Sequence, residues 1–190
     1  MYPNEIFQST LTKFVEVLSR FGIRFHLTGG ITAVAYGEPR MTQDLDLVID
    51  YDAALRDRES FLSALVEAGF HLELTTARKA IASKAMFQVL DIEQALKLDL
   101  YPESSIPGEL DRSVMAEVMP GVTLPIAARS DAALSKLIWA TKGSHKSRRD
   151  LRQILRNASP EESALVRRSA TSMGLVDELD RILSEPEEPA

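Results

Sequence analysis

The N-terminal two thirds of the chain mix helical and strand-like spacing of apolar residues. Apolar positions recur every three or four residues over 4–21, which predicts an amphipathic helix ending at Gly22. Further helices are predicted over residues 31–36, 52–69 and 108–118, and a short helix or a loop over residues 76–85. Alternation and short apolar runs predict strands over residues 24–28, 44–49, 70–74, 86–92, 95–102 and 123–127. The strands over 86–92 and 95–102 are expected to pair as a hairpin.

The pattern changes near residues 127–130, after which the apolar spacing is helical. Helices are predicted over about residues 131–142, 145–157, 160–172 and 174–184. The closing letters SEPEEPA are acidic and rich in proline, which is typical of a disordered tail. The chain is therefore expected to form an α/β (α+β) core with a mixed sheet over residues 1–128, a helical C-terminal region over 129–184 and a disordered tail over 185–190.

Composition excludes several classes of protein. The 190 residues are 45% hydrophobic and carry a formal net charge of −6, which argues against a general nucleic-acid coat protein. The chain has no cysteine, so disulfides, thiolate metal sites and thiol nucleophiles are excluded. Its three histidines lack ligand spacing, which argues against zinc. The N-terminus lacks the plan of a signal peptide, and no apolar run reaches the ~18 residues of a membrane span, so a cytoplasmic protein without membrane contact is expected.

Two carboxylates share one face of the strand predicted over 44–49. Side chains alternate along a strand, so Asp44 and Asp46 lie on one face while Leu45 and Leu47 lie on the other. Carboxylates this close repel each other, and a hard divalent ion such as Mg²⁺ would remove the repulsion. An exposed acidic face paired with Arg or Lys explains the spacing equally well, and both readings stay open.

Two further features add to this pattern. Gly29 and Gly30 stand between a strand and a helix, where glycine lets a backbone approach a phosphate at the helix N-terminus. A tight turn is the other explanation of a glycine pair. Asp99, on the strand over 95–102, would stand beside Asp44 and Asp46 if the two strands are neighbours. Lys97 shares the face of Asp99 and is expected to form an ion pair with it.

The letters TGG, RMTQDLDLVI and KLDLY together resemble the nucleotidyltransferase superfamily, the DNA polymerase beta-like group. SDAALSKLIWA and SHKSRRDLRQIL extend the likeness to the minimal bacterial branch that includes toxin nucleotidyltransferases of the abortive-infection type. Such a resemblance implies transfer of a nucleoside monophosphate from a triphosphate such as ATP to a hydroxyl acceptor, with release of pyrophosphate. It implies a magnesium-dependent enzyme, with two Mg²⁺ ions expected to stabilise the attacking and leaving oxygens.

The resemblance also implies roles for particular residues. Gly29 and Gly30 would hold the triphosphate, and Asp44, Asp46 and Asp99 would form the metal and catalytic set. Asp99 would also orient and deprotonate the acceptor, and Lys136 would neutralise the triphosphate. Asp131 and Asp150 would assist in nucleotide binding. Gly30 stands where many members have serine, so one hydroxyl contact to phosphate is missing.

Several assignments remain alternatives. Arg40 either contacts phosphate or offsets the acidic face. The basic residues between Lys142 and Arg156 form either a solvated helix face or a surface for RNA, such as a tRNA end. Trp139 is expected in the core rather than as a base-stacking platform. Protein and small-molecule acceptors, and a cognate antitoxin as partner, are equally compatible. The rival functions are a catalytically reduced nucleotide-binding regulator and an antitoxin-like partner protein with the same fold.

Overall fold

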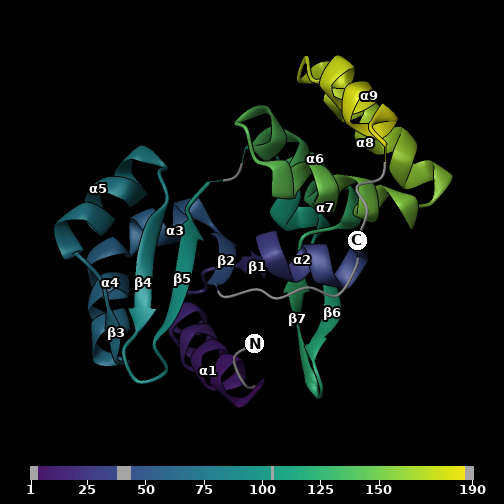
Figure 1. The fold of residues 1–190 in the computed structure, drawn as a ribbon. Coiled ribbons are helices and arrows are strands. Elements are labelled where there is room, and N and C mark those ends of the chain that lie inside the picture. The colour runs from purple at the N-terminus through teal and green to yellow at the C-terminus, as the bar shows by residue number, and fades with distance from the viewer. Residues whose placement is uncertain (1–3, 38–43, 104, 187–190) are drawn as a thin grey trace.

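A mixed β-sheet forms the centre of the protein (Figure 1). The structure is a computed structural model that describes residues 4–37, 44–103 and 105–186. Within this part of the chain the sheet has seven strands in the order β3-β4-β5-β2-β1-β7-β6. They are β1 (Phe25–Leu27), β2 (Asp44–Ile49), β3 (Phe70–His71), β4 (Phe87–Asp91), β5 (Leu96–Tyr101), β6 (Val114–Met119) and β7 (Val122–Ile126). The pairs β2–β5 and β1–β7 are parallel, and the other neighbours are antiparallel.

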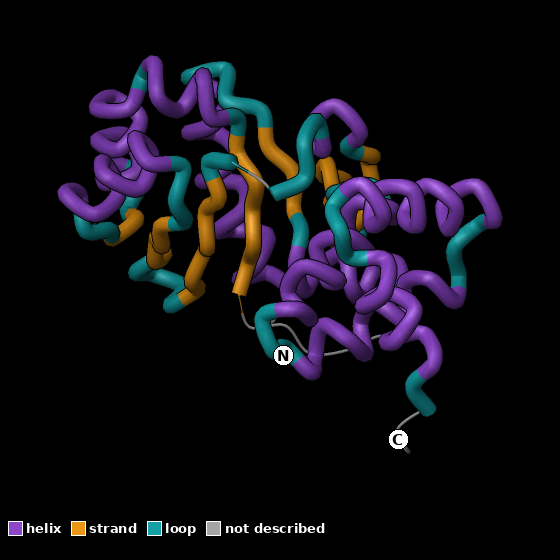
Figure 2. Tube along the Cα trace, turned by 90° about the horizontal axis from the view of Figure 1, so that it is seen from above, coloured by secondary structure: helices purple, strands orange, loops and turns teal. Residues whose placement is uncertain are grey.

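Helices lie in two groups on either side of the strands, as the view from above shows (Figure 2). The first part of the chain contributes α1 (Asn4–Arg20), α2 (Gly29–Tyr36), α3 (Tyr51–Arg56), α4 (Arg58–Glu67), α5 (Leu74–Ser83) and a 3₁₀ turn, η1 (Glu109–Arg112). The last part contributes α6 (Arg129–Thr141), α7 (His145–Arg156), α8 (Pro160–Ser172) and α9 (Val176–Ser184). The predicted mixed α/β fold with helices at the C-terminal end is confirmed. In the described residues, no helix is long and apolar enough to cross a membrane.

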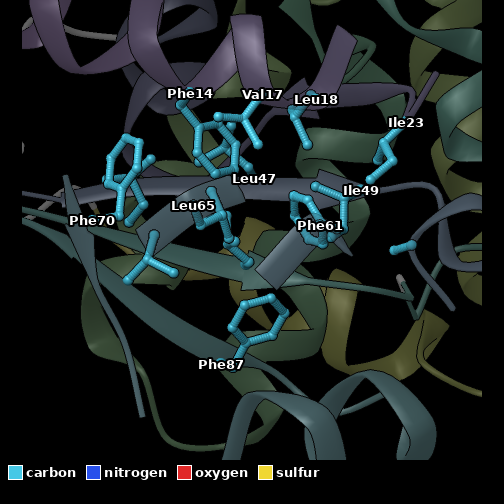
Figure 3. Packing of buried hydrophobic residues seen from close by; sticks show 14 of the residues in the cluster. Phe14, Val17, Leu18, Ile23, Leu47, Ile49, Phe61, Leu65, Phe70 and Phe87 are labelled. Carbon is cyan, nitrogen blue, oxygen red and sulfur yellow. The ribbon is translucent and has the colours of Figure 1, made fainter. Parts of the chain in front are cut away.

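The apolar face of β2 packs against helices α1 and α4. Leu45, Leu47 and Ile49 are fully buried there. Figure 3 shows Leu47 and Ile49 within the cluster. Phe14 of α1 and Phe61 of α4 are also fully buried, and Figure 3 shows both rings within this cluster. Since successive side chains alternate, burying these three residues turns Asp44 and Asp46 to the opposite face of the sheet. The core therefore fixes the direction of the carboxylates.

Helices α6 to α9 have a second hydrophobic cluster of their own. Its larger buried members from α6 and α7 are Leu134, Leu137, Leu151 and Ile154, and Ile106, which precedes η1, also belongs to it. Tyr36, at the end of α2, packs against both clusters and so joins the sheet to the C-terminal helices. The predicted boundary between residues 128 and 129 stays a prediction, and most of the predicted tail lies outside the described residues.

The helix predicted over 108–118 is wrong. This segment forms η1 and then β6, which pairs with β7 across the turn at Gly121, whose φ is +76°. Leu110, Val114 and Val118 recur every four residues and so imitate a helix. Pairing with β7 overrides that local spacing, because hydrogen bonds between the two strands satisfy the backbone groups of β6 that face β7.

Smaller differences have local causes. The strand predicted over 70–74 ends at His71, because the Glu73 carboxylate accepts hydrogen bonds from the N–H groups of Thr75 and Thr76 and begins α5. The segment 76–85, left open between helix and loop, is helical. The single helix predicted over 52–69 is two helices that meet at Asp57.

Candidate functional site

Strands β2 and β5 bring the predicted carboxylates together. In their parallel register Asp46 stands beside Asp99, and Asp44 stands beside Lys97. The hydrophobic residues between them are fully buried on the opposite face, so all four polar side chains share one face. The arrangement expected if the two strands were neighbours is therefore present.

The glycine corner lies directly against Asp46. The N–H of Thr28 donates to the Asp46 backbone carbonyl at 2.9 Å, which ties the corner to β2. Gly29 has a φ of +60°, and a Cβ at that position would lie 1.9 Å from Asp46 Oδ2. The N–H of Gly30, in the first turn of α2, donates to the Asp46 carboxylate. Only glycine at position 29 thus allows this carboxylate to reach the start of the helix.

The environment of Asp46 disfavours its charged form. Burial raises the pKa of Asp46 most, and the negative charges of Asp44 and Asp99 raise it further. Lys136 and the Gly30 N–H oppose that rise without cancelling it. The positive charge near Asp46 does not balance its carboxylate. A cation bound here would therefore be stabilised by that carboxylate.

Lys136 and Asp150 form a buried ion pair between α6 and α7. Lys136 Nζ on α6 lies 3.0 Å from Asp150 Oδ2 on α7, and the two side chains are only 9% and 7% exposed. Lys136 also reaches the site, because its charge acts on Asp46. Asp150 therefore holds Lys136 in place, and the structure joins the two predicted residues to the acidic strand.

A cleft of about 530 Å³ opens over these groups. Its floor includes Thr28, Gly29, Gly30, Asp44, Asp46 and Tyr101. One wall comes from α6 and α7, with Lys136, Trp139, Lys142 and Lys146. The other wall includes Lys84, Glu103 and Glu109. The cleft joins an acidic floor to a basic wall, which suits a ligand that carries both phosphates and a cation.

Other predicted residues are placed differently. The residues that line the cleft do not include Asp99, Asp131 or Asp150. The Arg112 guanidinium binds the Asp131 carboxylate through Nε and Nη2, each at 2.9 Å. The Asp131 side chain is 3% exposed, so the pair anchors the start of α6. Arg40 lies outside the described residues. The core placement of Trp139 is wrong: it is 44% exposed at the cleft, with Lys142 Nζ 4.7 Å from its ring centroid.

Some residues of the basic run form ion pairs, and others line the cleft. Arg148 and Arg152 pair with Glu185, and Arg148 also pairs with Glu178. The positive charges of these two arginines are therefore offset by acidic side chains of the protein itself. Lys142 and Lys146 instead line the cleft.

Sequence reasoning missed Tyr101. Its hydroxyl donates to Asp46 Oδ1 at 3.4 Å, a long hydrogen bond. Burial raises the pKa of Tyr101, and the charges of Asp46 and Asp99 raise it further, so the phenol stays a donor. Tyr101 follows Asp99 by two residues on the same strand, and that spacing alone would have placed it on the same face.

Asp44, Asp46 and Asp99 offer carboxylate oxygens, which are the ligands that a divalent ion such as Mg²⁺ prefers. Within the described ranges, no group of three or more His, Asp or Glu side chains is close enough to hold a metal ion as it stands. Lys97 Nζ lies 3.1 Å from Asp99 Oδ2 and 3.7 Å from Asp44 Oδ2, which confirms the expected ion pair. Asp99 Oδ1 is buried and has no hydrogen-bond partner among the described residues. This orphaned oxygen and the raised pKa of Asp46 both fit a hard cation such as Mg²⁺.

Solved structures with this fold include two proteins that act on antibiotics or confer resistance to them. One is the antibiotic-resistance factor ANT(2'')-Ia, with a TM-score of 0.58 and 14% identity over 95% of this chain and 98% of that one. Another is the lincosamide antibiotic adenylyltransferase LnuA in its lincomycin-bound form, with a TM-score of 0.52 and 12% identity over 78% of this chain and 96% of that one. At these identities the likeness shows the fold alone.

The family itself is shown by sequence. No curated protein matches the chain. The family described as "Nucleotidyl transferase AbiEii toxin, Type IV TA system" matches residues 14–182, a span that includes the acidic strands, the glycine corner and helices α6 to α8. The resemblance stated from the short motifs is thereby confirmed. The chain belongs to the AbiEii nucleotidyl transferase toxin family of type IV toxin–antitoxin systems.

Proposed function

We propose that the protein transfers a nucleoside monophosphate from a nucleoside triphosphate to a hydroxyl group of an acceptor, in a magnesium-dependent reaction. The observation that carries this proposal is the position of Asp46. Its carboxylate lies against Gly29, beside Asp99 and within the field of Lys136, on the floor of the cleft. A phosphate-binding corner, paired acids and a buried lysine meet there, and phosphoryl transfer needs positioning and charge stabilisation more than covalent chemistry by the protein.

Each group has a part in the proposed reaction. The start of α2 at Gly29 and Gly30 accommodates the triphosphate, and Lys136 offsets its charge. Asp44 and Asp46 hold the divalent ion, which when bound neutralises charge that develops on the phosphoryl oxygens. The acceptor oxygen forms a bond to the α-phosphorus, the bond from that phosphorus to the bridging oxygen breaks, and pyrophosphate leaves. Asp99 takes the proton of the attacking hydroxyl.

The acceptor that best suits the cleft is the end of an RNA, such as a tRNA. Trp139 offers an exposed ring with Lys142 Nζ 4.7 Å from its centroid, and Lys146 lines the same cleft. An aromatic ring with nearby cations is the usual combination for single-stranded nucleic acid, because bases stack and phosphates pair. In a toxin, modification of an essential RNA would stop growth, and a cognate antitoxin would relieve that block.

Labelling of cell contents tests the proposal. Purified protein is incubated with total cell extract, Mg²⁺ and each of the four triphosphates labelled at the α-phosphate, and RNA, protein and small molecules are then separated. We expect label in the RNA fraction with the wild type and none with Asp46→Asn. Label in protein or small molecules would keep the transfer reaction and refute the RNA acceptor.

Nucleotide binding can be followed separately through Trp139, the single tryptophan of the chain. Its ring lines the cleft, so a bound triphosphate should change its fluorescence. Binding without transfer to any fraction would favour the catalytically reduced regulator. Neither binding nor transfer would favour an antitoxin-like partner protein.

A further inference from the structure

Lys97 occupies the position between two of the site's carboxylates. Parallel pairing of β2 with β5 sets it beside Asp44, and it precedes Asp99 by two residues on the same strand. Its ammonium lies 3.1 Å from Asp99 Oδ2 and 3.7 Å from Asp44 Oδ2. These distances put one positive charge where a cation bridging Asp44 and Asp99 would otherwise lie.

A count of local charge shows what remains for a metal ion. Asp44, Asp46 and Asp99 carry three negative charges, and Lys97 supplies one positive charge. Lys136 and Asp150 offset each other as an ion pair. Among the described side chains this leaves an excess of negative charge, which a divalent ion would offset. A second ion beside Lys97 would meet an ammonium and a carboxylate oxygen already in use.

The Lys97 side chain is held but can be displaced. It is 40% exposed, whereas Asp99 beneath it is 11% exposed. Lys97 also lines a neighbouring hollow together with Gln88 and Leu90 of β4, so its flexible stem has a place to move to. A compact ammonium on four methylenes suits this task, because it delivers a point charge without fixed geometry.

We propose that Lys97 is a positioning residue that acts as a tethered cation between Asp44 and Asp99. The protein without nucleotide then holds one divalent ion, at Asp46, rather than the two that the sequence led us to expect. A second ion enters only with the phosphates of the nucleotide. Lys97 also leaves Asp99 Oδ1 as the one oxygen of that carboxylate not used by the ion pair. This inference rests on the proposed function, but its test does not require transfer.

Binding of Mn²⁺ to the protein without nucleotide tests the inference. The free ion is measured by electron paramagnetic resonance during titration of the wild type, Lys97→Met, Lys97→Arg and Asp46→Asn. We expect one tightly bound Mn²⁺ in the wild type and in Lys97→Arg. We expect a second one in Lys97→Met, or at least tenfold tighter binding of the first, and loss of the tight site in Asp46→Asn. Lys97→Met keeps an unbranched apolar side chain that is one atom shorter, so the charge is the main change.

Three results would overturn the inference: two tight ions in the wild type, none in the wild type, or unchanged or weaker binding in Lys97→Met. Thermal unfolding of each variant accompanies the titration. If Lys97→Met were unfolded, Lys97→Gln would replace it, since position 97 is partly exposed and tolerates a polar side chain. Transfer is measured separately. If the protein binds Mn²⁺ in the expected number but transfers no nucleotide, the proposed function alone is refuted. If it transfers nucleotide but holds two ions without nucleotide, the role of Lys97 alone is refuted.

Discussion

Gly29→Ala is the substitution whose effect follows most directly from the geometry of the site. The new methyl group would lie 1.9 Å from Asp46 Oδ2 and 2.5 Å from its Cγ, at a backbone φ of +60°. Ordinary contact begins near 3.4 Å, so the carboxylate must retreat by about 1.5 Å. Gly22→Ala is the matched control, because Gly22 has the same φ of +60° and nothing within 4 Å of an added Cβ.

The two variants separate backbone strain from displacement of the carboxylate. A left-handed φ costs an alanine about 1–2 kcal/mol, and both variants bear that cost. Crowding adds about 1–3 kcal/mol in Gly29→Ala alone. For a chain of this size each kcal/mol lowers Tm by about 2–4 °C. A misplacement of about 1 Å in a catalytic group costs on the order of 100-fold in rate, so kcat/KM of Gly29→Ala should fall at least that far.

Transfer of α-labelled nucleotide under saturating Mg²⁺, together with thermal unfolding, measures both effects. Gly22→Ala should lose stability and keep its specific activity at a temperature where it is folded. Gly29→Ala should lose activity even where it is fully folded. Equal activity of the two variants would refute the argument that Gly29 is required for the position of Asp46.

Three further predictions concern charge and hydrogen bonding, two of them at Asp46 and one at the start of α6. Because the pKa of Asp46 is raised on folding, the folded state binds its proton more tightly than the unfolded chain, so stability falls as pH rises through the raised pKa. Asp46→Asn removes this loss and should raise Tm at neutral pH without divalent ions while it abolishes transfer; a lower Tm would contradict the burial argument. Arg112→Met leaves the Asp131 carboxylate buried without its bidentate partner and should cost about 3 kcal/mol in urea unfolding, largely recovered by adding Asp131→Asn; a loss below 1 kcal/mol would show that the pair is not a structural anchor. Tyr101→Phe removes one long hydrogen bond to Asp46 and should lower kcat/KM only about two- to tenfold; a loss comparable to Asp46→Asn would assign the phenol a larger role.

Alternation along β2 could be predicted from sequence because it is a local property. The burial of Leu45 and Leu47 follows from their period of two, and the exposure of the opposite face follows from the same count. From the sequence, Asp99 could be placed beside Asp46 only on the condition that the two strands are neighbours. Strand order depends on contacts between segments some fifty residues apart, and nothing in either strand alone specifies its neighbour.

The errors arose where tertiary contacts outweighed local spacing. The spacing of Leu110 and Val114 predicts a helix over 108–118, yet residues from Val114 onward pair with β7 as strand β6. Trp139 follows Leu137 and Ile138 along α6, and this neighbourhood predicts a core position, but its ring lines the cleft and is exposed. Asp131 matched the family motif by position, and the partner that anchors it, Arg112, lies outside every motif that was read.

The measurement that tests the central claim most directly compares one nucleotide labelled at the α-phosphate with the same nucleotide labelled at the γ-phosphate. Nucleotidyl transfer at Asp46 predicts that the acceptor gains only the α-label, with one pyrophosphate released per label, and that Asp46→Asn gives neither product. Acceptor labelled from the γ-phosphate, or α-labelling that persists in Asp46→Asn, would contradict the assignment of this cleft.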